Sequence, residues 1–551
     1  MRFARFMRPA VLTLACFTLA TALLGYAINR TGIAAAYTDP VAHVRAQDES
    51  LYANTAVTFA TRGGWLTPRF QGRYILYKPP LVQWLAGLSL RAAGVSLWTL
   101  RLPSLLAGAY AVCLLFGWVH RSRSISAAWV AVSLLVSNPL WHVLSRICYT
   151  DMLAAAAIST AFAVVQREPG LASRGASVAF GAALAAGVMA KSVAGLLPLF
   201  ALGAYWLLSV PALRPPPKRI AMAVATAALI VAPWHAYQLA VHRQWFWMDY
   251  VRIQLLGFGM HPPEQHAVEG PARFYASGLW LTDPVLCIFV ASALPAFVAA
   301  LRARKPDALL LLSWILVAGS ALFAFRYRNL PYLLCLVAPL CVLAASFLPV
   351  RRTWTAVALL AGIFAVKTAF PERPWGLPFG ATEQPAAARL REYCRMDRPN
   401  ELIAVEPDDD FYSATLPLPR LRYCFVDPSH LALRVAPHYA PLGIILTPDQ
   451  FADPARWNSM FISRLRQWGL DSLEPVGTAI LADSDADVLR MIRAHAPSDF
   501  YLPERFRTAT EERFQETHRA VSDGSGRFFL LARAHPRVAD SRPAWVLPQD
   551  W

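Results

Sequence analysis

Charged residues are scarce in this chain of 551 residues. Asp, Glu, Lys and Arg make up 16% of it, while hydrophobic residues make up 56% and the mean hydropathy is +0.37. Soluble domains contain about 25% charged residues, so this chain has more apolar surface than a water-soluble core can hide. The composition excludes an ordinary soluble protein and predicts a polytopic membrane protein.

Several motifs of soluble enzymes and metal proteins are also missing. The eight cysteines include no C-x-x-C pair, so this zinc-binding spacing is absent. Residues 371–551 contain no phosphate-binding loop, no G-x-G-x-x-G and no nucleophile elbow. No internal repeat is visible in the sequence, which argues against a transporter or flippase built from inverted repeats.

What the chain does have is a series of hydrophobic runs. Eleven of them are long enough to cross a hydrocarbon layer of about 30 Å. They lie at 10–29, 100–119, 126–144, 150–166, 176–190, 193–210, 219–239, 285–302, 307–325, 330–348 and 353–370. The stretch 79–95 is interpreted either as a twelfth segment or as a helix at the membrane surface. The predicted fold class is a polytopic α-helical membrane protein with about eleven transmembrane helices.

The net charge of +17 comes from basic residues in short loops. Every second loop is basic, the pattern expected when the N-terminus is cytoplasmic. The first segment lacks a small-residue cleavage pattern and is interpreted as an uncleaved anchor. A nucleic-acid partner is disfavoured, because it would need the charge gathered on one face. The basic loop residues are Arg2, Arg5, Arg8, His120, Arg121, Arg123, Arg167, Arg174, Arg214, Lys218, Arg219, Arg302, Arg304, Lys305, Arg351 and Arg352.

This orientation places the unusual polar segments together on the outer side. They are the loops 30–99 and 240–284, the turns near Arg146–Asp151, Lys191 and Arg326–Arg328, and all residues after 371. Their shared side predicts one aqueous site at the outer leaflet.

Residues 1–370 form the predicted transmembrane domain, and residues 371–551 a periplasmic α/β domain. In the second region, strand-length runs at 401–405, 422–426, 442–446 and 528–532 alternate with helix-like stretches at 454–468 and 485–494. Its acidic run, Asp408 to Asp410, is interpreted as a solvated turn or helix start. Cys394 and Cys424 are its two cysteines and are candidates for a disulfide in an oxidising compartment.

Short motifs between residues 48 and 340 have an informative order and spacing. They are DESLYA at 48–53, GWLTPRFQGRYILYKPP at 64–80, RLPS at 101–104, TDM at 150–152, MAKS at 189–192, QH at 265–266 and NLPYLLCLVAPL at 329–340. In these motifs the chain resembles the bacterial lipid A aminoarabinose transferases and the protein O-mannosyltransferase-like enzymes of glycosyltransferase superfamily C. The resemblance covers roughly residues 10–350.

The resemblance implies an integral membrane glycosyltransferase of the bacterial inner membrane. It would move a sugar from a polyprenyl-phosphate donor to a lipid A, lipopolysaccharide or other envelope acceptor on the periplasmic side, among membrane lipids. The chain departs from the pattern in two places. Tyr77 stands where the family usually has an acidic residue before Lys-Pro, and Val251 and Arg252 replace a Glu-His pair. The resemblance therefore does not assign the sugar or the acceptor.

The donor chemistry predicts cations in the outer site. No nucleotide sugars occur outside the membrane, so the leaving group is a lipid phosphate whose developing charge needs neutralising. Lys78, Lys191, Arg326 and Arg328 are the candidates. The alternative for Lys191 and the two arginines is a side chain that only extends to the interface from a helix end. Pro79 and Pro80 are expected to keep the backbone after Lys78 extended, because each restricts its own φ and the preceding residue.

Two carboxylates are predicted to be catalytic. Asp48 would hold or deprotonate the acceptor, and Asp151 is the second candidate, with a helix cap as its alternative. By resemblance, Glu49 and Tyr52 are expected to bind substrate, although Glu49 could instead be a solvated loop acid. 

The loop 240–284 holds three residues with metal-ligand side chains. His261, Glu264 and His266 are candidates for binding a divalent metal ion, and the alternative is a solvated loop. His266 is also a substrate-binding candidate through the QH motif.

Three other functions stay open at this stage. A lipid or glycan transporter or flippase would share the intramembrane charges. An O-antigen ligase-like enzyme would also act outside, but is not expected to have an acidic pair and Lys-Pro in its first loop. A non-catalytic scaffold of an envelope glycan complex would keep the fold without the chemistry.

Overall fold

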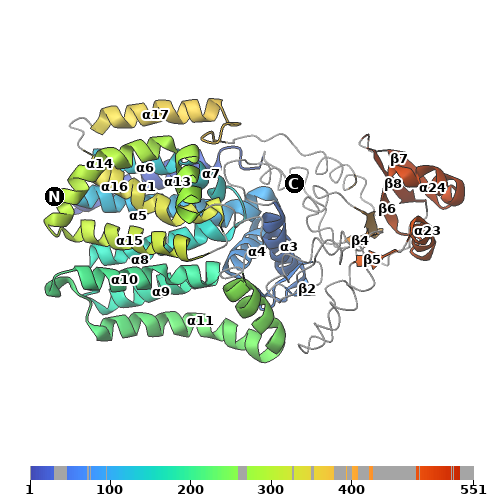
Figure 1. Cartoon of the computed structure of the whole chain (residues 1–551), viewed down its shortest axis with the longest axis horizontal. Coiled ribbons are helices and arrows are strands. Elements are labelled where there is room, and N and C mark those ends of the chain that lie inside the picture. The colour runs from blue at the N-terminus through green and yellow to red at the C-terminus, as the bar shows by residue number, and fades with distance from the viewer. Residues whose placement is uncertain are drawn as a thin grey trace.

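A bundle of long helices makes up the first two thirds of the protein (Figure 1). The computed structural model describes residues 2–29, 46–70, 73–74, 76–94, 96–257, 270–325, 328–348, 353–377, 393, 400–406, 421–425, 479–482, 484–522, 524 and 526–533. The bundle helices are α1 (Arg2–Gly25), α5 (Leu97–Ser122), α6 (Ile125–Val136), α7 (Pro139–Ser145), α8 (Thr150–Arg167), α9 (Arg174–Lys191), α10 (Leu197–Leu208), α11 (Pro217–Phe246), α14 (Pro284–Arg302), α15 (Pro306–Ala324), α16 (Leu334–Phe347) and α17 (Thr353–Ala369).

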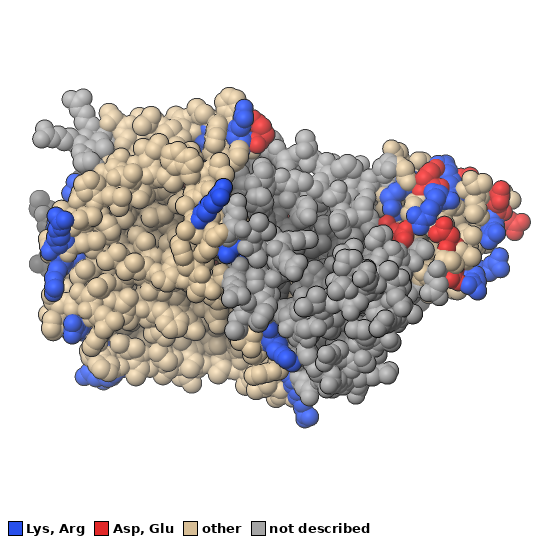
Figure 2. All heavy atoms as spheres, in the orientation of Figure 1, with Lys and Arg blue, Asp and Glu red and all other residues tan. Residues whose placement is uncertain are grey.

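Many of these helices have the length and composition of membrane spans. The described residues contain six such helices, or seven if the bent pair α6 and α7 is one span, and two shorter apolar helices at 11–25 and 354–369. Lysine and arginine side chains gather at the end of the bundle where α14 and α15 join, while most of the broad adjacent face in view is uncharged (Figure 2). The protein is a polytopic membrane protein, and each of the eleven predicted segments coincides with helical structure.

Two of the predicted segments are not simple spans. The run 126–144 bends by 69° between α6 and α7, at Ser137 and Asn138. The chain also folds back between α9 and α10, through the short 3₁₀ helix η1 (Ser192–Leu196). There a Cβ built on Gly187 would lie 2.9 Å from the Cα of Gly195, so these two backbones touch and no larger side chain fits between them.

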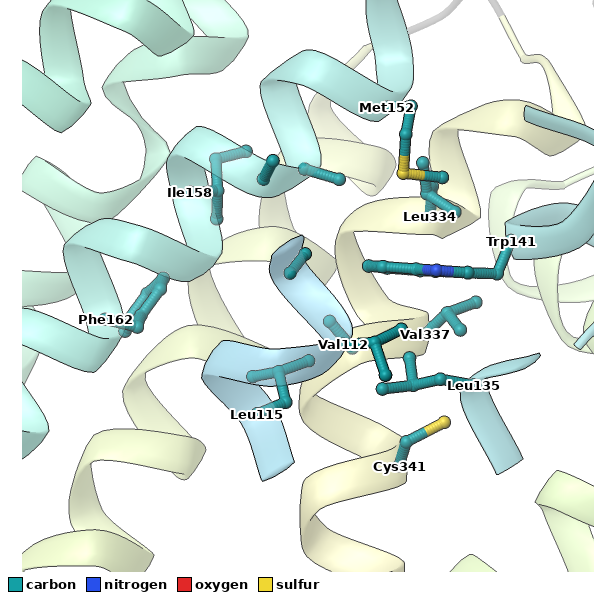
Figure 3. Close-up of a cluster of buried hydrophobic side chains, with 14 of the residues drawn as sticks. Val112, Leu115, Leu135, Trp141, Met152, Ile158, Phe162, Leu334, Val337 and Cys341 are labelled. Atoms are coloured by element: carbon teal, nitrogen blue, oxygen red, sulfur yellow. The ribbon is translucent and has the colours of Figure 1, made fainter. Parts of the chain in front are cut away.

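The core lies where α5, the α6–α7 pair, α8 and α16 meet. Figure 3 shows the Trp141 ring between Met152 and Leu334 on one side and Leu135 and Val337 on the other. All five side chains are buried. The bend that carries Trp141 is therefore packed into the centre of the bundle, and it leads directly to the first turn of α8.

Shorter elements cover the end of the bundle opposite the turn between α14 and α15 (Figure 1). They are α3 (Ala46–Arg62), the hairpin β1 (Arg69–Phe70) and β2 (Arg73–Tyr74), α4 (Leu81–Ala93), the π-helix η3 (Trp247–Gly257), α13 (Pro271–Thr282) and the 3₁₀ helix η5 (Leu330–Leu333). With 13 residues, α4 is about 20 Å long and is too short to span a bilayer. A twelfth span at 79–95 is therefore wrong, and α4 packs on α3 instead.

A buried ion pair joins α17 to this bundle. Lys367 Nζ donates to Asp283 Oδ1 at 2.9 Å and to the Ser137 carbonyl at 2.8 Å. Asp283 also accepts from Asn138 Nδ2 at 2.8 Å and caps the first turn of α14 through the amide of Leu286. The polar break between α6 and α7 thus receives its partners from α14 and α17.

The C-terminal region contains a six-stranded mixed sheet in the order β5-β4-β3-β6-β8-β7. Its strands are β3 (Leu402–Val405), β4 (Leu421–Phe425), β5 (Ala479–Leu481), β6 (Asp499–Pro503), β7 (His518–Ser522) and β8 (Arg527–Ala532), with helices α23 (Asp485–Ala494) and α24 (Arg507–Phe514). β3 is parallel to β4 and β6, and β8 is antiparallel to β6 and β7.

These elements agree with the strands predicted at 401–405, 422–426 and 528–532 and with the helix at 485–494. The other predicted elements, at 442–446 and 454–468, lie outside the described residues, as do Asp408 to Asp410 and Cys394. Cys424 is buried in the sheet.

Candidate functional site

The first turn of α3 is held by a buried ion pair. The guanidinium of Arg101 binds Glu49 with two hydrogen bonds, of 2.8 Å from Nε and 3.0 Å from Nη2. The amide of Cys148 donates to the same carboxylate at 2.9 Å. The Glu49 side chain is 0% exposed, so the interpretation as a solvated loop acid is wrong. Paired and enclosed in this way, Glu49 fixes α3 against α5 and the turn before α8.

The end of α1 is capped by the same group of arginines. Arg101 Nη1 donates to the Ile28 carbonyl at 2.7 Å. Arg146 donates to the carbonyls of Leu24, Tyr26 and Ala27. These carbonyls have no partner within the helix, and cationic donors are favourable at its C-terminus. The hydrogen bonds of Arg101 and Arg146 thereby join the end of α1 to α3, α5 and the turn before α8.

Lys191 and Asp151 form an ion pair between the end of α9 and the start of α8. The Lys191 ammonium also lies 4.5 Å from the ring centroid of Tyr332 on η5, within cation–π distance. The cap of α8 is Tyr149, with no side-chain hydrogen bond, so the interpretation of Asp151 as a helix cap is wrong. Lys191, 15% exposed, is a partnered side chain and does not merely extend to the interface.

Lys78 lies in the loop before α4 and binds a tyrosine. Its Nζ donates to the Tyr52 hydroxyl at 2.7 Å. Tyr52 is buried on α3. Its ring and the ring of Tyr149 form a T-shaped pair with centroids 5.7 Å apart. Pro80, the residue before α4, has φ −93° and ψ 21°, so the backbone after Lys78 turns at once into a helix. The expectation of an extended segment is wrong at Pro80.

The two lysines share one neighbourhood. Lys78 is near enough to Lys191 for their positive charges to interact. Within the described part of the chain, Lys191 is neutralised by Asp151, whereas Lys78 forms no ion pair. The described side chains of the site therefore carry an excess positive charge next to the rings of Tyr52, Tyr149 and Tyr332, which is suited to binding an anion.

The loop that carries Lys78 is anchored by side chains from two helices. Trp84 Nε1 on α4 donates to the Trp65 carbonyl at 2.6 Å. On α11, Trp234 Nε1 and Gln238 Nε2 both donate to the Leu66 carbonyl, at 3.0 and 2.5 Å. The carbonyls of Trp65 and Leu66, which lie in a loop, thus receive their hydrogen bonds from side chains of α4 and α11.

A second polar chain lies beside Lys191. Ser192 Oγ donates to the Tyr250 hydroxyl at 2.9 Å, and this hydroxyl lies 3.0 Å from His235 Nε2. None of these three residues is among the site residues predicted from the sequence. The available signal was His235, an ionisable side chain inside the apolar run 219–239, a location where such residues are usually functional.

Several predicted site residues cannot be placed. Asp48 lies on α3 next to Glu49, but its side chain is outside the described residues, as are Arg326, His261, Glu264 and His266. Arg328 lies shortly before η5, the element that carries Tyr332. Among the residues that the structure describes, no group of three or more His, Cys, Asp or Glu side chains could hold a metal ion.

Sequence comparison finds relatives for this part of the chain. Residues 77–237 match the family described as dolichyl-phosphate-mannose-protein mannosyltransferase. The undecaprenyl phosphate-alpha-4-amino-4-deoxy-L-arabinose arabinosyl transferase of Yersinia pestis is 26% identical over 324 residues, which is 54% of this chain and 54% of that protein. The enzyme of the same name from Aeromonas hydrophila is 26% identical over 321 residues, 54% of this chain and 55% of its own length. The chain spans about half the length of these curated relatives.

Structural comparison extends the likeness to nearly the whole chain. ArnT from Cupriavidus metallidurans in the apo state superimposes with a TM-score of 0.62 at 17% identity, over 95% of this chain and 97% of that one. The same protein bound to undecaprenyl phosphate gives a TM-score of 0.65 at 16% identity, with the same coverage. The resemblance seen in the motifs is thereby confirmed: this chain is similar in sequence to undecaprenyl phosphate-aminoarabinose transferases, and it has the fold of ArnT.

Proposed function

We propose that the protein is an integral membrane glycosyltransferase. It moves a sugar from a polyprenyl-phosphate donor to a lipid A, lipopolysaccharide or other cell-envelope acceptor on the periplasmic side. The observation that carries the proposal is Lys78, a cation held by Tyr52 and lacking a described carboxylate partner, beside the Lys191–Asp151 pair. Such a site supplies positive charge to the phosphate that leaves the sugar.

The relatives support the donor class. Those in the sequence comparison are named for undecaprenyl phosphate-aminoarabinose, and one of the structural relatives was solved with undecaprenyl phosphate. Tyr77, Val251 and Arg252 differ from the residues expected in aminoarabinose transferases. We therefore extend only the polyprenyl-phosphate part of the relatives' chemistry to this chain and leave the sugar unassigned.

The reaction requires one bond exchange. An acceptor oxygen attacks the anomeric carbon, the bond from this carbon to the phosphate oxygen breaks, and the phosphate keeps the electron pair. Lys78 stabilises the charge that develops on the phosphate, with Lys191 nearby. If the acceptor is a hydroxyl, its proton passes to a carboxylate, for which we propose Asp48. If the acceptor is a phosphate, it is already anionic and Asp48 serves to position it.

Asp48→Asn is expected to reduce transfer by at least about 100-fold, within the range of general base catalysis. The change keeps the side-chain shape and removes charge and basicity. The measurement is transfer of labelled sugar from a polyprenyl-phosphate donor to membrane lipids by the purified protein. The matched control is Asp487→Asn, which is on the distant helix α23. Near-normal turnover of Asp48→Asn would exclude Asp48 as the principal catalytic carboxylate.

The proposed orientation is tested by cysteine labelling in intact cells. Arg91 on α4 and Lys305 at the α14–α15 turn are both exposed and lie at opposite ends of the bundle. A membrane-impermeant maleimide is expected to label Arg91→Cys in intact cells and Lys305→Cys only after permeabilisation, with the wild type as background. The opposite labelling pattern would invert the topology and end the proposal of a periplasmic site.

A further inference from the structure

The π-helix η3 contacts both turns that carry the site lysines. It follows α11 directly and spans Trp247–Gly257. Long π-helical segments are rare and frequently mark functional sites. Two consecutive residues of η3, Asp249 and Tyr250, are buried, and each one reaches a different lysine-bearing turn.

Asp249 holds the Lys78 loop. Its Oδ2 accepts a hydrogen bond from the backbone amide of Leu76 at 3.3 Å. Leu76 is buried and comes two residues before Lys78, so this contact fixes the backbone from which the Lys78 side chain extends.

Tyr250 holds the Lys191 turn. His235 Nδ1 lies 2.9 Å from the Val231 carbonyl, which can only accept, so Nδ1 carries the proton and Nε2 is an acceptor. Tyr250 therefore donates its hydroxyl proton to His235 Nε2 and accepts from Ser192 Oγ. Burial raises the pKa of Tyr250, so the hydroxyl keeps this proton, although the Ser192 bond partly opposes the shift.

The Ser192 backbone needs such a support. It has φ 55° and ψ −136°, a backbone region that favours glycine and strains a serine. Ser192 directly follows Lys191 and begins the reversal in which Gly187 touches Gly195. The strained turn and its hydrogen bond to Tyr250 thus determine where the Lys191 side chain starts.

An apolar cluster joins the same parts. Leu76, Met189, Trp234, Phe246 and Tyr250 are buried against one another. Phe246 and Tyr250 stack at 5.0 Å between ring centroids. The cluster therefore packs the Lys78 loop, the end of α9, α11 and η3 into one unit.

We propose that Asp249 and Tyr250 are a paired clamp that sets the spacing between Lys78 and Lys191 and thereby the affinity for the donor phosphate. The inference rests on the proposed function, and it adds residues that act through the lysines and do not touch the donor. The two ammonium groups have the same charge, so a frame that holds their side chains in place is needed to keep them near each other. A bound phosphate between them offsets this repulsion and gains affinity from spacing that is already set.

The clamp is tested with Tyr250→Phe and Ser192→Ala, which remove the two ends of one hydrogen bond and keep the ring and the turn. Each is expected to weaken undecaprenyl phosphate binding in nanodiscs by roughly 3- to 10-fold, the range of one net hydrogen bond. The double variant should lose no more affinity than the single variant with the larger loss.

Asp249→Ala is expected to weaken undecaprenyl phosphate binding by a similar factor, and this effect should vanish in a Lys78→Met background. The matched control is Tyr237→Phe, because Tyr237 is a half-buried tyrosine on α11 near this site. This variant should bind undecaprenyl phosphate like the wild type.

The outcomes separate the clamp from the proposed function. If the wild type neither binds undecaprenyl phosphate nor transfers sugar, the proposed function fails. If the wild type does both and Tyr250→Phe keeps its affinity, the clamp is overturned. A lower unfolding midpoint with unchanged affinity shows a purely structural Tyr250 and also overturns the clamp. Non-additive loss of affinity with intact folding supports it.

Discussion

Lys78→Ala is expected to lower the rate of sugar transfer by about 100- to 1000-fold, the usual effect of removing one preorganised group that stabilises developing charge. Lys78 is bound to the Tyr52 hydroxyl and forms no ion pair among the described residues, so its charge is available to the donor phosphate. Lys78→Arg should recover part of the rate, because guanidinium can also offset phosphate charge but with a different geometry. The measurement is transfer rate against donor concentration for both variants.

Lys305→Ala is the control for this experiment, because Lys305 is exposed at the opposite end of the bundle. It should transfer sugar like the wild type. An unchanged maximal rate and an unchanged apparent donor affinity in Lys78→Ala would remove Lys78 from the site. A loss in Lys78→Ala that Lys78→Arg does not restore at all would show that the ammonium geometry, in addition to the charge, is required.

Glu49→Gln is expected to lower the free energy of unfolding by about 3–5 kcal/mol, the cost of breaking a buried ion pair from one side. The substitution leaves the Arg101 guanidinium buried with its charge uncompensated, since Glu49 is 0% and Arg101 1% exposed. It also weakens the anchoring of α3 to α5. The measurement is the yield of monodisperse protein and its denaturation midpoint in detergent.

The matched control for Glu49→Gln is Glu504→Gln in the C-terminal region. Glu504 pairs with Arg507 at 2.8 Å, but both side chains are substantially exposed, so the expected change is within about 0.5 kcal/mol. Equal stability of Glu49→Gln and the wild type would contradict the structural role of this pair. Loss of transfer without loss of stability would instead favour direct substrate binding by Glu49.

Much of the candidate site could be predicted from local sequence. Lys78, Asp151, Lys191 and Tyr52 stand in recognisable motifs, and the structure brings them into one neighbourhood. Their partners could not be predicted, because nothing near Lys191 in the sequence points to Tyr332. The contact arises because the fold brings Tyr332 of η5 to the end of α9.

The helix pattern shows the same division. The apolar runs marked each bundle helix, because burial in lipid requires a long uninterrupted hydrophobic stretch. The bend between α6 and α7 and the reversal at Ser192 were not visible in hydropathy, since both lie inside or between apolar runs. Each depends on contacts made by other helices, such as Lys367 reaching the Ser137 carbonyl.

The amino-acid sequence by itself determined that this is a polytopic membrane protein, where its helices lie and which motif residues are chemically unusual. These are local properties, because hydropathy and charge act residue by residue along the chain. Only the tertiary structure decided which polar groups meet. Glu49 and Arg101 are separated by 52 positions and Asp283 and Lys367 by 84, and each pair forms only when packed helices exclude water and leave a buried charge no other partner.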